Sequence, residues 1–144
     1  MEKITIGKLA KACNVKIDTI RYYERVNLVK PDGRTDSGYR FYDPEIIRRV
    51  KFIKNAQGLG FSLDEIQKLL DLRASDTATA ADVLKATKSK ISEFQEKISD
   101  LENIQNILKE LAEQCPEDAH IMECPILDYL YPDHREKNKN NFEG

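Results

Sequence analysis

Residues 5–26 read TIGKLAKACNVKIDTIRYYERV. Thr5 can cap a helix in which apolar residues recur at helical spacing, and Asn14-Val15 interrupts that helix. Asp18 is expected to cap or open a second short helix, which carries apolar residues at positions 20, 23 and 26. Two short helices joined by a tight turn, apolar where they meet, are typical of a helix-turn-helix.

A small wing and a second pair of helices are predicted next. Turn signals at 31–33 and 36–38 flank short extended runs, and residues 39–42 alternate in a way that favours a two-stranded wing. Asp43-Pro44-Glu45 is expected to start a third helix with Asp43 as its cap, and Gly58-Leu59-Gly60 to end it. Ser62 and Glu65 have the spacing of a capping box, which predicts a fourth helix.

One long helix is predicted from residue 82 to 114, a stretch without Gly or Pro. Such a helix cannot bury its apolar stripe alone, so we expect it to pair with a second copy as a parallel or antiparallel coiled coil. Packing against the first half of the same chain is the alternative. The stripe expected to form the dimer contact consists of Ile91, Phe94, Ile98, Leu101, Leu108 and Leu111.

The charge is divided unevenly along the chain of 144 residues. Residues 1–61 carry 13 basic and 7 acidic side chains, whereas residues 62–144 carry 10 basic and 18 acidic ones. A basic first half points to a polyanionic partner. The sequence shows no apolar run long enough for a membrane span and no apolar signal core, so a cytoplasmic protein with reduced thiols is expected. An enzyme is not expected, because there is no Gly-rich phosphate loop and there are only two His.

Four segments together resemble the MerR family of bacterial transcription regulators: ITIGKLA at 4–10, TIRYYE at 19–24, GYRFY at 38–42 and FSLDEI at 61–66. They occur in the family's order and spacing, and the likeness extends from about residue 3 to 127. The resemblance implies a mainly α fold, with a winged helix-turn-helix and a long helix that forms an antiparallel coiled coil in a homodimer. It also implies an activator of promoters whose spacer is too long. With its effector bound, the dimer would bend and untwist the DNA so that RNA polymerase engages both promoter elements.

These observations divide the chain into five parts. A winged helix-turn-helix DNA-binding domain is expected at 1–73, a linker at 74–81 and the dimerisation helix at 82–114. An effector-binding loop with a short helix is expected at 115–131, followed by a disordered tail at 132–144.

The expected DNA contacts lie on the helix-turn-helix, the wing and the third helix. Arg21 can reach a phosphate or the edge of a guanine. Tyr22 and Tyr23 point about 100° apart on a helix, and the resemblance designates Tyr23 as the phosphate contact. The full set is Lys16, Thr19, Arg21, Tyr22, Tyr23, Arg34, Tyr39, Arg40, Lys51 and Lys54.

Two cysteines just beyond the long helix are the candidate effector site. Cys115 and Cys124 are each followed by Pro, and eight residues separate them. Two thiolates suit soft ions such as Cu(I), Ag(I), Au(I), Hg(II), Cd(II) and Zn(II). The alternatives are a pair of buried structural cysteines and a disulfide switch, although no feature of the sequence is expected to lower the pKa of either thiol. Cys13, on the apolar face of the first helix, is interpreted as a core residue.

The choice of metal depends on details of the resemblance. Ala80 stands where divalent-ion sensors of the family carry a third Cys, and Ala81-Asp82-Val83 is shared with the copper branch. The eight-residue spacing, in contrast, is that of mercury and zinc sensors of the family. His120 lies near the position at which zinc-type members of the family carry a ligand His. A borderline ion could use Cys115, Cys124 and His120, with a carboxylate from Glu117, Asp118 or Glu123. We expect Cu(I) or Ag(I), with Zn(II), Cd(II) or Hg(II) sensing, or a thiol-based response to oxidants or electrophiles, as alternatives.

Overall fold

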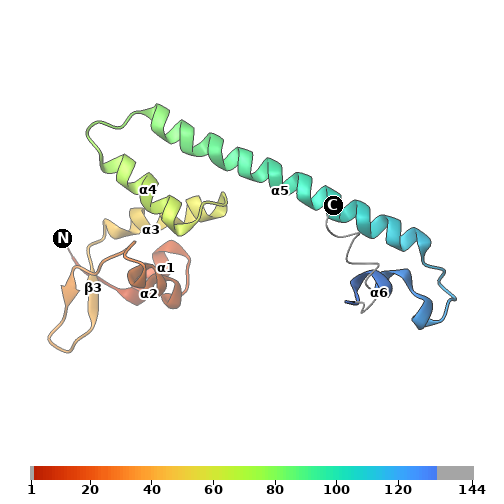
Figure 1. The fold of residues 1–144 in the computed structure, drawn as a ribbon. Helices are drawn as coiled ribbons and strands as arrows, with labels where there is room; N and C mark the ends of the chain where they lie inside the picture. The colour runs from red at the N-terminus through yellow and green to blue at the C-terminus, as the bar shows by residue number, and fades with distance from the viewer. Residues whose placement is uncertain (1, 133–144) are drawn as a thin grey trace. The chain divides into compact units, whose positions relative to one another are not determined.

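A computed structural model describes residues 2–132 and divides the chain into two compact units, the first ending at Lys90 and the second beginning at Ile91. The predicted mainly α fold with a winged helix-turn-helix and a long helix is confirmed (Figure 1). None of the helices in the described part combines the length and apolar character that a bilayer crossing requires. The predicted tail lies outside the described residues, apart from its first residue.

The helix-turn-helix consists of α1 (Ile6–Cys13) and α2 (Ile17–Arg25). Thr5 caps α1 as predicted, because its hydroxyl accepts a hydrogen bond from the Lys8 backbone N–H at 3.2 Å. Asn14 ends α1 in the left-handed conformation, with φ 55°, which Asn tolerates better than most residues. Asp18 was expected to cap or open α2, and the capping role is wrong. Lys16 is the N-cap and Asp18 lies inside the first turn, where its negative charge favours the helix N-terminus.

The wing belongs to a sheet with one strand more than predicted. The strands β1 (Ile4–Thr5), β2 (Gly33–Arg34) and β3 (Arg40–Tyr42) are antiparallel, in the order β1-β3-β2. The two-stranded prediction missed β1, which pairs Ile4 with Tyr42 and is too short to show an alternating pattern. The segment at residues 4–5 therefore extends the wing sheet along the edge of β3 that does not pair with β2.

The second helix pair consists of α3 (Ile46–Gly58) and α4 (Leu63–Ala74). The expectation that Asp43 caps α3 is wrong, because residues 43–47 first form turns and Glu45 is the N-cap. The Asp43 carboxylate instead accepts a hydrogen bond from the Glu45 N–H at 2.9 Å. The predicted end of α3 is confirmed, since Gly60 has φ +90° just beyond it. The capping box of α4 is confirmed as well.

One hydrophobic core holds these helices and the sheet together. Its fully buried side chains come from α1, α2, α3, α4 and β3 and from the segment after α2: Leu9, Ile20, Leu28, Val29, Tyr42, Val50, Ile53 and Ile66. Cys13 is 3% exposed and belongs to the same core. Because the core reaches from the helix-turn-helix to α4, the recognition helix and the second helix pair form one body.

The long helix α5 (Ala80–Gln114) starts two residues earlier than predicted and runs for 35 residues, about 52 Å at 1.5 Å per residue. Lys90 is the only buried residue of α5. In the second unit, α5 is followed by a short 3-10 helix, η1 (Ile121–Glu123), and by α6 (Pro125–Leu130).

Candidate nucleic-acid interface and thiol pair

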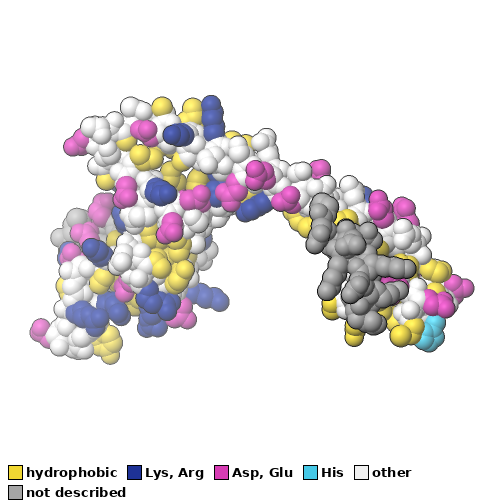
Figure 2. Space-filling model, viewed as in Figure 1, with side chains coloured by type: hydrophobic (Ala, Val, Ile, Leu, Met, Phe, Trp, Pro, Cys, Tyr) yellow, Lys and Arg dark blue, Asp and Glu magenta, His cyan; other side chains and the backbone are white. Residues whose placement is uncertain are grey.

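The exposed side of α2 carries positive charge over a surface hollow. This hollow of about 680 Å³ is lined by Asp18, Arg21, Glu24, Arg25 and Arg40. Figure 2 shows Lys and Arg side chains gathered along the lower edge of the first unit. Arg21 is exposed and pairs loosely with Asp18, at 3.4 Å, so its guanidinium is available to an incoming anion. The arrangement suits the phosphate backbone of a nucleic acid.

The two tyrosines of α2 lie in different surroundings. Tyr22 is 43% exposed, whereas Tyr23 is 2% exposed and packs in the core. The Tyr23 hydroxyl donates to the Gln57 side-chain oxygen at 2.5 Å, and burial raises the pKa of this hydroxyl. Tyr23, expected as the phosphate contact, is thus held inward by α3, because it lies on the face of α2 that meets the core.

Arg25 is a cation of this surface that the sequence interpretation missed. Its guanidinium lies 5.4 Å from the centre of the Tyr22 ring, a distance at which a cation is attracted to the face of an aromatic ring. The spacing of Arg21 and Arg25, one turn apart on α2, was a signal that could have identified it.

The predicted wing residues lie at the surface and partly bond within the wing. Tyr39 is 74% exposed at the tip. The Arg34 guanidinium donates to the Gly38 carbonyl at 3.3 Å, which stabilises the hairpin turn. Arg40 lies 3.0 Å from the Glu24 carboxylate, so this residue connects β3 with α2.

The remaining predicted contacts occupy different surroundings. Lys16 is exposed and Thr19 half-buried at the start of α2. The Lys54 ammonium donates to the Asn14 carbonyl at 3.1 Å and to the Cys13 carbonyl at 3.4 Å, and therefore stabilises the C-terminus of α1. Lys51 lies apart from the α2 hollow, in a groove of about 530 Å³ with Arg48, Arg49 and Arg73.

The structure brings Cys115 and Cys124 together. Their sulfur atoms lie 3.7 Å apart, both thiols are free, and both residues are half-buried. Cys115 follows the end of α5, and Cys124 is the N-cap of α6. The pair can therefore hold one thiophilic ion between its sulfur atoms after small movements, or close into a disulfide.

The two thiols differ in acidity. The pKa of Cys124 is lowered, first by the backbone N–H of Leu127 and also by that of Ile126 and by the Cys115 thiol. The pKa of Cys115 is raised, because its thiol hydrogen-bonds to Cys124. The expectation that nothing lowers either pKa is therefore wrong. Only the folded loop places Cys124 where it meets the first N–H groups of α6.

His120 does not join the two cysteines. Its Nδ1 accepts a hydrogen bond from the Met122 backbone N–H at 3.1 Å, which makes His120 the cap of η1. Between residues 2 and 132, no group of three or more His, Cys, Asp and Glu side chains is placed to hold a metal ion. Within the described residues the candidate donor set is therefore the two sulfur atoms.

The residues predicted for dimerisation lie along α5. Ile91, Ile98, Leu101 and Leu108 are 51–64% exposed, and Phe94 and Leu111 are half-buried. The stripe is thus largely uncovered in a single chain, which is unfavourable for apolar side chains in water. Pairing with a second copy stays a prediction.

Two family models match the chain. Residues 4–72 match the model described as MerR HTH family regulatory protein, and residues 47–111 match the model described as MerR, DNA binding. The mercuric resistance operon regulatory protein of Bacillus cereus is 46% identical over 128 residues, which cover 89% of this chain and 97% of that protein. The HTH-type transcriptional regulator CueR of Yersinia pestis is 38% identical over 88% of this chain and 91% of its own length.

Two solved structures are also similar. The transcription regulator PbrR691 from Ralstonia metallidurans CH34, in complex with lead(II), has a TM-score of 0.80 and 28% identity, covering 89% of this chain and 99% of that one. The dual function transcriptional regulator MerR from Bacillus megaterium MB1, in complex with mercury(II), has a TM-score of 0.67 and 42% identity, covering 88% and 98%.

Proposed function

The chain belongs to the MerR family of transcriptional regulators, and from this premise we propose that it is a DNA-binding homodimer that responds to a soft, thiophilic metal ion. The observation that carries the proposal is the pair of free thiols with sulfur atoms 3.7 Å apart, beyond a helix whose apolar stripe is uncovered. It is a regulator and not an enzyme.

We propose that the DNA-binding surface comprises the exposed side of α2 and the tip of the wing. Arg21, Arg25 and Tyr22 lie together on α2, and Tyr39 extends from the wing. Cations on a recognition helix bind phosphates and base edges, and a wing adds contacts to the backbone. The dimer would occupy a promoter with an overlong spacer and, with the effector bound, distort it so that RNA polymerase can start transcription.

Hg(II) is the first candidate for the effector. It rests on the 46% identity to a mercuric resistance regulator and the 42% identity to a regulator solved with mercury(II). Cu(I) or Ag(I), which the sequence interpretation preferred, becomes the second candidate, supported by the 38% identity to CueR. All these ions are soft and suit a donor set of two thiolates, whereas a structural zinc site normally takes four ligands.

Cys115 and Cys124 would hold the ion, and His120 would stay in its capping role. Ala80, at the first residue of α5, carries no donor atom. An ion bound by both cysteines would tie the end of α5 to the start of α6 and thereby order the loop between them. Such ordering would distinguish the ion-bound form of the regulator from the ion-free form, and binding of the ion would shift the population towards the ordered form.

The test is an anaerobic competition titration of the reduced full chain with Hg(II), Cu(I) and Zn(II), each against ligands of known affinity. We expect tight binding of one Hg(II) per thiol pair, weak Zn(II) binding, and transcription from the cognate promoter in vitro only with the bound ion. Cys124→Ser should abolish ion binding and response while operator affinity is retained, and His120→Gln should behave as wild type. Loss of operator affinity in Cys124→Ser, or tight Zn(II) binding that depends on His120, would contradict the proposal.

A second candidate function is a response to oxidants or electrophiles through the same thiols. The lowered pKa of Cys124 favours it, because the thiolate is the reactive form of cysteine. Thiol counting separates the two functions. A metal sensor recovers both free thiols when a chelator removes the ion, whereas an oxidised or alkylated sensor does not.

A further inference from the structure

Lys90 is an unusual residue of the first unit. It is 6% exposed and is the only charged residue buried in the described part of the chain. An ammonium group removed from water is costly unless it is paired and hydrogen-bonded. A charge buried in this way on an otherwise uncovered helix therefore requires a specific partner.

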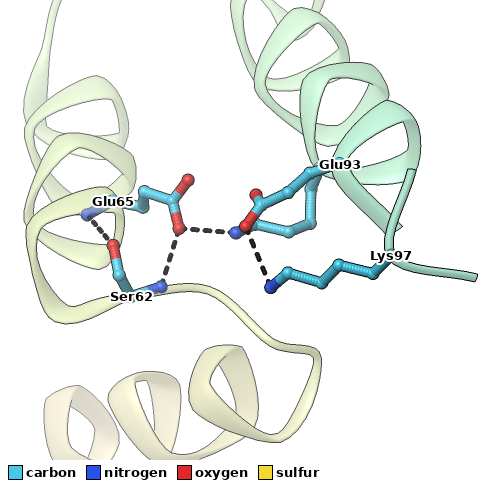
Figure 3. Close-up of polar contacts among 5 residues, drawn as sticks. Ser62, Glu65, Glu93 and Lys97 are labelled. Carbon is cyan, nitrogen blue, oxygen red and sulfur yellow. Dashed lines mark hydrogen bonds and ion pairs between the residues drawn. The ribbon is translucent and has the colours of Figure 1, made fainter. Parts of the chain in front are cut away.

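One partner of Lys90 is a carboxylate that is itself fixed in place. The Lys90 ammonium lies 2.8 Å from Glu65 Oε1 and 5.6 Å from the centre of the Phe61 ring. The same Glu65 oxygen accepts the Ser62 backbone N–H at 2.7 Å, and the Glu65 N–H donates to the Ser62 hydroxyl at 3.2 Å (Figure 3). The capping box of α4 therefore holds the Glu65 side chain through hydrogen bonds that do not involve Lys90.

The element that carries Glu65 is anchored in the DNA-binding core. On α4, Ile66 is fully buried and Leu70 is 7% exposed, both in the core cluster that includes Val50 and Ile53 of α3. The Lys90 ion pair therefore joins α5 to the rigid body that also contains the recognition helix. This ion pair is a second attachment of α5 to that body, in addition to the chain connection at residues 75–79.

Two separate points of attachment hold the part of α5 that belongs to the first unit. Ala80 and Lys90 are ten residues apart, about 15 Å along an α-helix. Between them α5 does not form a packed seam. A groove of about 550 Å³ lies there, lined among others by Phe52, Leu59, Leu69, Leu72 and Val83. Because the ammonium is a compact charge on a flexible stem, the polar contact can be kept while the helix beside the groove shifts.

We propose that Glu65 and Lys90 are positioning residues that fasten the first three turns of α5 to the DNA-binding unit, and that this fastening passes the effector's signal from α5 to the recognition helix. The signalling half of the inference rests on the proposed function. The fastening half rests on the contacts of Lys90 alone. A regulator whose α5 is loosely attached would bind its operator but fail to convert effector binding into a change at the DNA.

The test compares Lys90→Met and Glu65→Gln with a matched control in the full chain. Met keeps the length of the lysine stem without its charge, and Gln can still accept the Ser62 N–H in the capping box. The control is Lys97→Met. The Lys97 ammonium lies 3.2 Å from the carboxylate of Glu93, another residue of α5 (Figure 3). It also lies 5.7 Å from the ring centre of Phe94, which is on α5 as well.

Four quantities are measured in each variant: hydrogen exchange, induction, operator affinity and ion affinity. Amide hydrogen exchange over residues 80–90 should be faster by about fivefold or more in Lys90→Met and Glu65→Gln, and unchanged in Lys97→Met. Induction of transcription in vitro by Hg(II), or by Cu(I) if that ion proves to be the effector, should fall by about fivefold or more, the lower end of typical allosteric coupling. Operator affinity and ion affinity should stay within about threefold of wild type. The double variant should match the stronger single variant, because both single variants remove the same ion pair.

Three results would overturn the proposal. Unchanged exchange over residues 80–90 would show that the pair does not fasten α5. If operator affinity fell by the same factor as induction, the Glu65–Lys90 pair would have a structural role only. Equal loss of induction in Lys97→Met would show that any ion pair on α5 has this effect. If the wild type responds to no ion, the proposed function fails, and the exchange readout still decides whether the pair fastens α5.

Discussion

Tyr42 connects the wing with the recognition helix, and removing its hydroxyl tests how strongly. Tyr42 is fully buried on β3, and its hydroxyl donates to one oxygen of the Glu24 carboxylate on α2. The other oxygen lies 3.0 Å from Arg40 Nε, and the Glu24 side chain is 12% exposed. The three side chains thus form one charge-assisted network between the two elements expected to contact DNA.

We expect Tyr42→Phe to lower the free energy of unfolding by about 1.5–2 kcal/mol. A hydrogen bond to a charged group contributes about 1.5–3 kcal/mol. The lower part of that range applies, because Arg40 still pairs with Glu24 in the variant and the ring leaves no cavity. Urea unfolding of the full chain, followed by circular dichroism at one protein concentration, measures the change. Tyr39→Phe is the control, since Tyr39 is 74% exposed and should change stability by less than about 0.5 kcal/mol.

A pH series separates the hydroxyl from the ring. Burial, followed by the hydrogen bond to Glu24, raises the pKa of Tyr42 well above its ordinary value of 10.0. Because the folded state keeps this proton more tightly than the unfolded state, the stabilisation is complete below pH 10.0 and is lost as the pH rises above it. The difference between wild type and Tyr42→Phe should therefore shrink above pH 10.0. A variant within about 0.5 kcal/mol of wild type, or a difference that does not depend on pH, would refute the reasoning.

Three further predictions concern acid stability, a helix end and the DNA surface. The pKa of Glu65 is lowered from 4.5 to about 2, first by its hydrogen bond with Lys90, so its stabilisation is complete above pH 4.5 and lost as the pH falls towards 2. Because the Glu65 side chain is 39% exposed, solvent screening limits this stabilisation to about 1 kcal/mol. Thermal melts between pH 3 and 6 should show that the melting temperature falls less steeply with decreasing pH in Glu65→Gln than in wild type. Parallel curves for the two proteins would contradict this prediction. Gly60→Ala should destabilise the chain by about 1 kcal/mol or more, since Gly60 has φ +90°. Gly58→Ala inside α3 should stabilise the chain slightly, because nothing lies within 4 Å of an added Cβ. Denaturant midpoints that move in the same direction for both variants would argue against this distinction. Arg21→Ala should weaken operator binding by about 1–3 kcal/mol if Arg21 contacts a base edge, and fluorescence anisotropy showing unchanged affinity would remove Arg21 from the interface.

Much of the fold could be predicted because its signals are local. Thr5 and Ser62 cap helices through hydrogen bonds that span three residues. Gly60 ends α3 through its own backbone conformation. The errors at Asp18 and Asp43 each displace a helix cap by two residues. There, several polar residues compete for the same free N–H groups, and neighbouring turns decide between them.

Parts of the candidate site could not be predicted, because they depend on residues distant in the chain. Tyr23 is turned inward by Gln57, which follows 34 residues later. The pairing of Ile4 with Tyr42 adds a strand that has no periodic signal of its own. Likewise, Lys90 looks like any surface lysine on a charged helix until Glu65 and Phe61 are seen to enclose it.

The sequence by itself determined the order of the helices, the wing, the long helix with its apolar stripe and the two cysteines that follow it. These features are written in spacing and in side-chain type, which each residue carries regardless of its neighbours. Tertiary structure alone decided which tyrosine of α2 faces solvent, which thiol is the more acidic and which lysine of α5 is buried. Exposure, pKa and ion pairing are set by surroundings, and the surroundings of Tyr23, Cys124 and Lys90 exist only after the chain has folded.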